Sequence, residues 1–132
     1  MKRGFTLVEL LAVIAVLAII SLIAIPSINT SIKKSREGAY LKQINIIETA
    51  AKKWGIENDS LLPEIGSDEI LTIDLNTLNT LGYLKEKKII DPRTEEELRG
   101  CVKLSYNNSY NQYEYTFIDN LTECDSYNIN NK

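Results

Sequence analysis

The 132-residue sequence predicts an α+β protein in which a long, bent N-terminal α-helix packs on a small antiparallel β-sheet head. Apolar residues recur at helical spacing over residues 5–58, and the first half of this segment is apolar enough to span a membrane. From Cys101 onward apolar and polar residues alternate, which is the period of a half-buried strand. We therefore expect a short basic segment, a membrane-spanning helix, its amphipathic continuation and a globular head, at residues 1–4, 5–26, 27–58 and 59–132.

The span from Phe5 to Ile25 contains one charged residue, Glu9. As a helix rising 1.5 Å per residue it covers roughly 30 Å, which matches the hydrocarbon thickness of a bilayer. Lys2 and Arg3 precede the span, so the positive-inside tendency keeps this end in the cytoplasm. The sequence thus predicts a single-pass protein of the cytoplasmic membrane with its C-terminal head outside.

Glu9 is the candidate functional residue of the span. A charged side chain near the centre of a bilayer costs on the order of 2–3 kcal/mol, so an acid in such a segment indicates a functional role and a partner. The simpler interpretation is that Glu9 lies near one end of the helix and reaches the membrane interface. Glutamate is shorter than lysine or arginine and reaches the interface less well, which favours the functional interpretation.

The residues at the N-terminus are Met1-Lys2-Arg3-Gly4 followed by Phe5-Thr6-Leu7-Val8-Glu9. They resemble the processing site of type IV pilins and pseudopilins. The resemblance covers residues 2–26 and includes the basic leader, the glycine, the phenylalanine, the glutamate, the apolar run and Pro26. It implies that a prepilin peptidase cleaves between Gly4 and Phe5 and that the new amine of Phe5 is then methylated. It also implies that helix 5–26 forms the core of a filament of identical subunits. A softer match of Gly82-Tyr83-Leu84 and Asp91-Pro92 is to Gram-positive, clostridial-type members.

Such processing gives Glu9 a physical role. The amine of Phe5 in one subunit meets the carboxylate of Glu9 in a neighbour, so each charge gains a partner inside an apolar core. A subunit docked out of register breaks this pair, at a cost of about 3–5 kcal/mol. We therefore expect Glu9 to set the register of assembly between subunits.

The N-terminal residues allow two other interpretations. An ordinary secretory signal has a shorter apolar region and a small-residue cleavage site, whereas this region carries an acid and runs into Pro26. The alternative that stays open is a monomeric single-span protein that displays a small extracellular binding head. It leaves the order of Gly4, Phe5 and Glu9 unexplained.

Beyond the span, apolar residues continue at helical steps, at Ile28, Ile32, Ala39, Ile44, Ile47, Ala51 and Trp54. We expect the C-terminal half of this stripe to pack on the head. Pro26 removes a backbone donor, which predicts a kink there. Gly55 and the cluster Asn58-Asp59-Ser60 are predicted to end the helix.

The head is predicted to begin with a short extended piece at residues 70–73 and a short helix capped by Asp74 and stopped by Gly82. The apolar side of that helix, expected to pack on the head, is Leu75, Leu78 and Leu81. An antiparallel hairpin follows from Cys101, with its turn at residues 107–112. Its tyrosines suit contact with sugars or proteins, but we favour cross-strand packing.

Cys101 and Cys124 are the only cysteines and both lie in the exported part, which suggests a disulfide. A loop of this size would stabilise the fold by roughly 3 kcal/mol. The bond would hold segment 120–125 on the start of the hairpin, as pilins close their C-terminal loop. Free thiols remain the alternative for a cell without an oxidising export pathway.

Catalytic, metal and cofactor sites find no support in the sequence. Histidine is absent, no Gly-rich phosphate loop occurs, and two cysteines alone are too few ligands for a structural metal. The net charge of −3 gives no basic field for nucleic acid. The expected partners are copies of the chain itself, a prepilin peptidase, the pilus assembly machinery and, before assembly, the lipid bilayer. A major pilin, a minor pilin and a secretion or competence pseudopilin all stay open.

Overall fold

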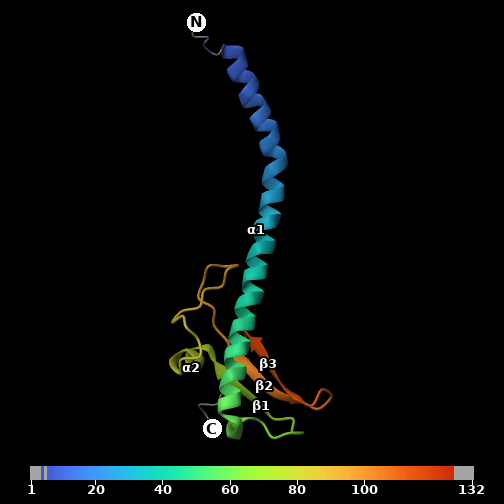
Figure 1. Cartoon of the computed structure of the whole chain (residues 1–132), viewed down its shortest axis with the longest axis vertical. Coiled ribbons are helices and arrows are strands. Elements are labelled where there is room, and N and C mark those ends of the chain that lie inside the picture. The colour runs from blue at the N-terminus through green and yellow to red at the C-terminus, as the bar shows by residue number, and fades with distance from the viewer. Residues whose placement is uncertain (1–3, 5, 127–132) are drawn as a thin grey trace. The chain divides into compact units, whose positions relative to one another are not determined.

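The computed structural model describes residue 4 and residues 6–126, and the chain divides into two compact units between Gly38 and Ala39. Helix α1 (Leu7–Glu57) belongs to both units, and the remaining elements belong to the second (Figure 1). The long apolar helix and the small antiparallel sheet confirm the α+β class.

In the first unit α1 runs through Pro26 without a break in its helical assignment. Hydroxyl groups within the apolar run are bonded to the helix itself. Ser21 Oγ donates to the Leu17 carbonyl at 2.7 Å, and Thr30 Oγ1 donates to the Pro26 carbonyl at 3.2 Å. From Leu7 to Ile25 α1 presents an almost wholly apolar surface. The kink at Pro26 stays a prediction.

The second unit is built on a three-stranded antiparallel sheet of order β1-β2-β3. Strands β2 (Cys101–Asn107) and β3 (Gln112–Ile118) form the predicted hairpin, with Val102 opposite Phe117. Strand β1 (Ile70–Asp74) adds to the other edge of β2, with Ile73 opposite Val102. A short 3₁₀ helix, η1 (Asp59–Leu61), follows α1.

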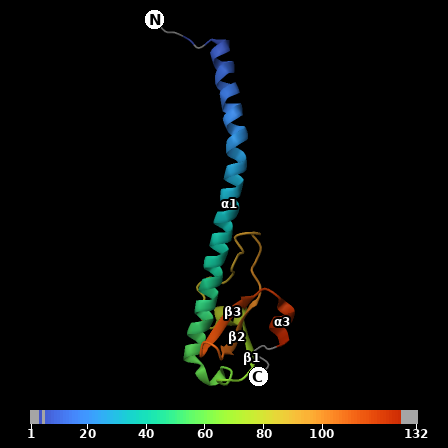
Figure 2. The ribbon, with the colours of Figure 1, turned by 90° about the vertical axis from the view of Figure 1, so that its right-hand side faces the viewer.

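The core lies between the sheet and the part of α1 that belongs to the second unit. Ile47, Ala51 and Trp54 are buried there against the apolar side chains of β1 and β2. The C-terminal half of the helical stripe thus packs on the head as predicted, whereas Ile28 and Ile32 remain exposed. Figure 2 shows the sheet between α1 and a second helix, α3 (Leu121–Ser126).

Gly55 does not end the helix, contrary to the prediction, because α1 continues to Glu57. The residue is buried, and a Cβ atom built on it would collide with the hydroxyl of Tyr115, with the Tyr115 Cζ atom 3.2 Å away. Glycine is present here because strand β3 brings a tyrosine ring against the helix backbone.

Helix α2 (Leu75–Thr80) buries Leu75 and Leu78, but Leu81 is 55% exposed, so its predicted packing is wrong. The helix ends before Leu81, and Gly82 with φ +86° turns the chain there. Asp74 occupies the N-cap position but makes no side-chain capping bond.

Cys101 and Cys124 form the expected disulfide, with their Cα atoms 5.7 Å apart. Segment 120–125 contains most of helix α3 and is not the loop that was expected. Thr72, buried in β1, donates its hydroxyl to the Cys124 carbonyl at 2.8 Å. The disulfide and this hydrogen bond hold α3 on the sheet.

The hairpin tyrosines mostly serve packing. The rings of Tyr106 and Tyr113 meet edge to face with centroids 5.1 Å apart, a favourable aromatic geometry. The Tyr113 hydroxyl donates to the Pro63 carbonyl at 2.8 Å, and Tyr115 packs against the core. Tyr110, in the hairpin turn, is exposed.

Two glycines of α1 provide a matched test of this packing. We expect Gly55→Ala to destabilise the head by about 1–3 kcal/mol, because the added methyl group collides with Tyr115. Gly38→Ala should instead stabilise the helix by up to about 1 kcal/mol, since a Cβ there meets no atom within 4 Å. Denaturant unfolding of the full chain in detergent, followed by Trp54 fluorescence, measures both. Adding Tyr115→Phe should relieve Gly55→Ala, and equal effects at the two glycines would contradict the assignment.

Candidate functional site

The start of α1 is closed by a reciprocal pair of hydrogen bonds. The Thr6 N–H donates to Glu9 Oε2 at 3.0 Å, and the Glu9 N–H donates to Thr6 Oγ1 at 3.2 Å. This is a capping box, in which two side chains satisfy two backbone donors of the first helical turn. Glu9 therefore stabilises the start of its own helix, a role that our sequence reasoning missed although Thr6-x-x-Glu9 has the pattern of a capping box.

The other residues of the predicted processing site are only partly described. Gly4 is exposed, and a Cβ built on it would meet no atom within 4 Å. Phe5, Lys2 and Arg3 lie outside the described residues, and so do the predicted cleavage and methylation of Phe5.

Next to this capping box α1 exposes a long apolar surface. Each large apolar side chain from Leu7 to Ile28 is between 52% and 76% exposed. Within the described residues, α1 is the one helix that is long and apolar enough to cross a membrane. Soluble monomers rarely leave a continuous apolar surface of this kind in water, so this surface needs a covering partner.

The family model described as the prokaryotic N-terminal methylation motif matches residues 1–25. This is the signature of type IV pilins and pseudopilins. The chain carries the type IV pilin signature. The match includes Glu9 and most of the apolar surface of α1, and it points to a structural pilin-type protein. Comparison with curated proteins and with solved structures gave no match.

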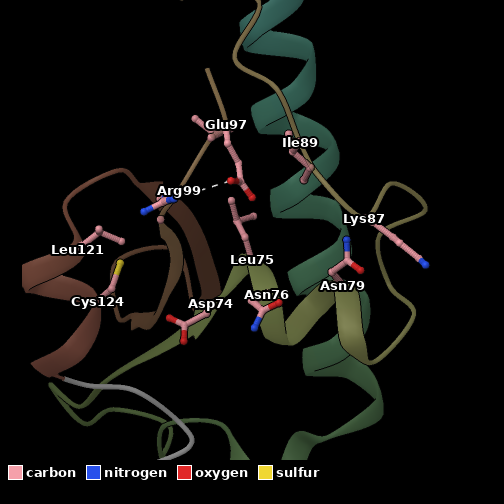
Figure 3. A pocket seen from close by; sticks show the side chains of 12 residues that line it. Asp74, Leu75, Asn76, Asn79, Lys87, Ile89, Glu97, Arg99, Leu121 and Cys124 are labelled. Carbon is pink, nitrogen blue, oxygen red and sulfur yellow. Dashed lines mark ion pairs between the residues drawn. The ribbon is translucent and has the colours of Figure 1, made fainter. Parts of the chain in front are cut away.

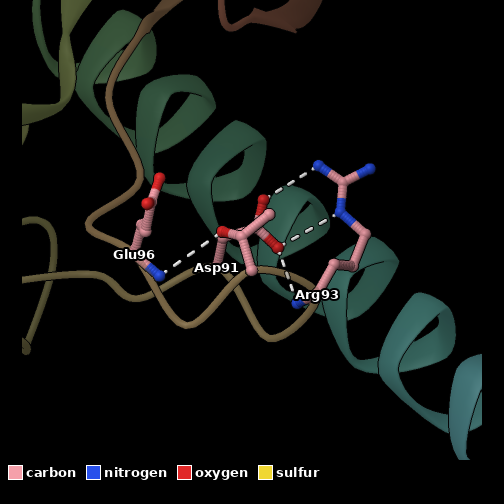
Figure 4. A network of polar contacts seen from close by, with 4 residues as sticks. Asp91, Arg93 and Glu96 are labelled. Carbon is pink, nitrogen blue, oxygen red and sulfur yellow. Dashed lines mark hydrogen bonds and ion pairs between the residues drawn. The ribbon is translucent and has the colours of Figure 1, made fainter.

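In the head, an ion pair organises the loop between α2 and β2. Arg93 donates from Nε to Asp91 Oδ1 at 3.1 Å and from Nη2 to Oδ2 at 2.9 Å, and its backbone N–H also donates to Oδ1 (Figure 4). The Arg93 guanidinium lies 3.3 Å from the ring centroid of Tyr40 on α1. The backbone N–H of Asp91 donates to the Glu96 carbonyl at 2.8 Å. This Asp91–Arg93–Tyr40 cluster ties the loop to α1.

These contacts fix the charge of Asp91. The hydrogen bonds from Arg93 lower the pKa of the Asp91 carboxyl below its ordinary value, although burial acts in the opposite direction.

A second contact between the loop after α2 and α1 comes from the Tyr83 hydroxyl, which donates to the Glu57 carboxylate at the end of α1. That bond raises the pKa of Tyr83.

A hollow of about 410 Å³ lies beside α2 and the disulfide (Figure 3). Of the residues that line it, Arg99 pairs with Glu97 at 3.8 Å, and Asn79 Nδ2 donates to the carbonyl of Glu86, which lies outside the lining. Among the described residues no group of three potential metal ligands occurs.

The two ion pairs Asp91–Arg93 and Glu97–Arg99 should contribute differently to the unfolding free energy as pH changes. Asp91→Asn should lower the unfolding free energy at pH 7 by about 1.5–3 kcal/mol, because hydrogen bonds to a charged partner are lost from a buried site. Glu97→Gln, the matched control in an exposed pair, should change it little. Because the pKa of Asp91 is lowered by folding, its contribution is present above about pH 4 and is lost as pH falls through the folded-state pKa. Unfolding curves at pH 7 and pH 3 check this, and a pH-independent effect of Asp91→Asn would contradict it.

Proposed function

We propose that this chain is a prepilin that polymerises through its N-terminal helix into a type IV pilus or pilus-like filament. Such a filament serves adhesion, motility, secretion or DNA uptake. The observation that carries the proposal is the exposed apolar surface of α1, most of which lies within the N-terminal methylation motif.

Processing comes first in this proposal. A prepilin peptidase removes residues 1–4 by cleaving between Gly4 and Phe5, and the new amine of Phe5 is methylated. Residues 5–26 hold the precursor in the cytoplasmic membrane, with Lys2 and Arg3 inside and the head outside. The pilus assembly machinery then moves the subunit from the bilayer into the filament at the cell surface or across the envelope.

In the filament the apolar surface of α1 is covered by the same surface of neighbouring copies. Exchange of lipid for protein adds little hydrophobic free energy, so close packing and polar contacts must decide where a subunit docks. Glu9 provides such a contact. An ionised carboxylate accepts about four hydrogen bonds, so Glu9 can keep its bond from Thr6 and still accept one from a neighbour's amine.

Leader removal is tested at the cleavage site. We expect Gly4→Glu to block processing, because a bulky charged side chain replaces the smallest residue beside the bond that is cleaved. Immunoblotting should show the variant as a membrane-bound precursor that is longer than the mature protein. Normal maturation of Gly4→Glu would contradict the assignment of the cleavage site.

The register role of Glu9 is tested by three substitutions. Glu9→Leu should insert in the membrane and mature normally but lose filaments, because a more apolar span no longer offers a partner to the amine. Glu9→Gln keeps the capping side chain and removes the charge, so it should also lose filaments.

Thr6→Ala is the matched control. It removes one capping bond, worth about 1 kcal/mol, and keeps the charge, so we expect it to assemble. Filaments sheared from cells and counted by electron microscopy measure all three. Normal filaments from Glu9→Leu would contradict the register role of Glu9. Normal filaments from Glu9→Gln alone would limit Glu9 to capping.

A further inference from the structure

The head carries an apolar groove between α1 and the loop that follows α2. Its volume is about 680 Å³. Ile47, Leu84 and Ile89 are buried at its floor, whereas Ile46 and Ile90 are 61% and 45% exposed on its walls. Its remaining lining is Ala39, Lys42, Gln43, Tyr83, Lys85, Glu86 and Pro92.

Lysines border this groove. Lys42 on α1 and Lys85 on the loop line it, with Glu86 as the one acid among the lining residues. Lys87 and Lys88 follow directly in the sequence, so the loop segment 85–88 carries three lysines and one glutamate. The Asp91–Arg93–Tyr40 cluster holds the loop on α1, so the loop that lines the groove is ordered within the single chain. We call this site the lysine groove.

A segment of opposite charge to the lysine groove follows the end of α1. Residues 59–69 contain four acidic residues and no basic one, and we call this segment the acidic turn. At its centre the large apolar side chain of Ile65 is 74% exposed. Leu61, 42% exposed, lies in the same segment.

The acidic turn has a defined conformation. The Glu64 carbonyl accepts hydrogen bonds from the Ser67 N–H at 3.0 Å and from Ser67 Oγ at 2.8 Å, and Gly66 takes the left-handed φ of +85°. Pro63 is buried, and its carbonyl accepts the Tyr113 hydroxyl. Ile65 is therefore presented on an ordered turn, which lowers the entropy cost of inserting it into a partner.

The two features lie at opposite ends of the head unit. The groove contacts α1 at residues 39–47, whereas the acidic turn begins after Glu57, at least ten residues or about 15 Å further along the helix. Figures 1 and 2 both show the loop that borders the groove and the segment after α1 at opposite ends of this unit. One chain cannot join its own two surfaces, but two copies can.

We propose that the acidic turn of one subunit docks into the lysine groove of a second copy of the chain, with Ile65 entering the groove. The contact joins two different surfaces, and such head-to-tail contacts produce open helical assemblies when the rotation between copies does not close a ring. Opposite charges favour this pairing, and the acidic turn is repelled by anionic lipid. The proposal rests on the filament proposed above and adds which surfaces of the heads meet in it.

Cysteine cross-linking in the full chain tests the contact. Filaments are sheared from cells that make the double variant Ile65→Cys/Ile46→Cys and are treated with a mild oxidant. The native cysteines are already bonded to each other and buried, so they do not react. We expect a ladder of covalent multimers on a non-reducing gel, and none from either single variant.

Ile46→Cys combined with Thr116→Cys is the matched control, since Thr116 is exposed on β3 outside both surfaces. Filaments of the Ile65→Cys/Ile46→Cys variant without a ladder, or a ladder of equal strength in the control, would overturn the docking. The proposed function would stand in that case. Absence of filaments from the unmodified chain would instead overturn the proposed function.

Charge exchange gives a second test, which does not need cysteines. Lys42→Glu/Lys85→Glu should reduce the number of filaments about tenfold or more, because like charges then face each other across the contact. Adding Glu64→Lys/Asp68→Lys should restore them. Normal assembly of the first variant, or no recovery with the second pair, would assign the groove to another partner and overturn the proposal.

Discussion

The structure depends on one constraint: apolar side chains along a single helix must be covered. Helix α1 meets this constraint in two ways. In the head unit Ile47, Ala51 and Trp54 are covered by the sheet. From Leu7 to Ile28 the large apolar side chains are exposed within the described residues, and a bilayer or other copies can cover them. The proposed assembly of subunits would cover this second part of the helix.

The head is held in one conformation by contacts between distant segments. Tyr115 lies against Gly55, the disulfide holds α3 on the sheet, and Asp91 with Arg93 ties a long loop to α1. These contacts stabilise the head, and the Asp91–Arg93 pair also orders the loop that borders the lysine groove. A rigid subunit loses less conformational entropy when it joins a filament, so stability and assembly are linked.

The sequence predicts those features that depend on hydrophobic period. The long helix, the hairpin and the buried half of the stripe follow from spacing alone. The prediction for Gly55 is wrong because glycine occurs both at helix ends and where another side chain lies against the helix backbone. Only the position of Tyr115 in the folded chain distinguishes these two cases. The Asp91–Arg93–Tyr40 cluster joins residues about fifty positions apart, which no local pattern reveals. The capping box of Glu9, by contrast, could have been inferred from the sequence.

The central claim is that the chain is found in filaments after leader removal. Its most direct test is the mass of the N-terminal peptide of the chain in filaments sheared from the cell surface. We predict a peptide that begins at Phe5 and carries one additional methyl group. A chain that begins at Met1, or that begins beyond Pro26, or that occurs in the membrane fraction and never in filaments, would contradict this account.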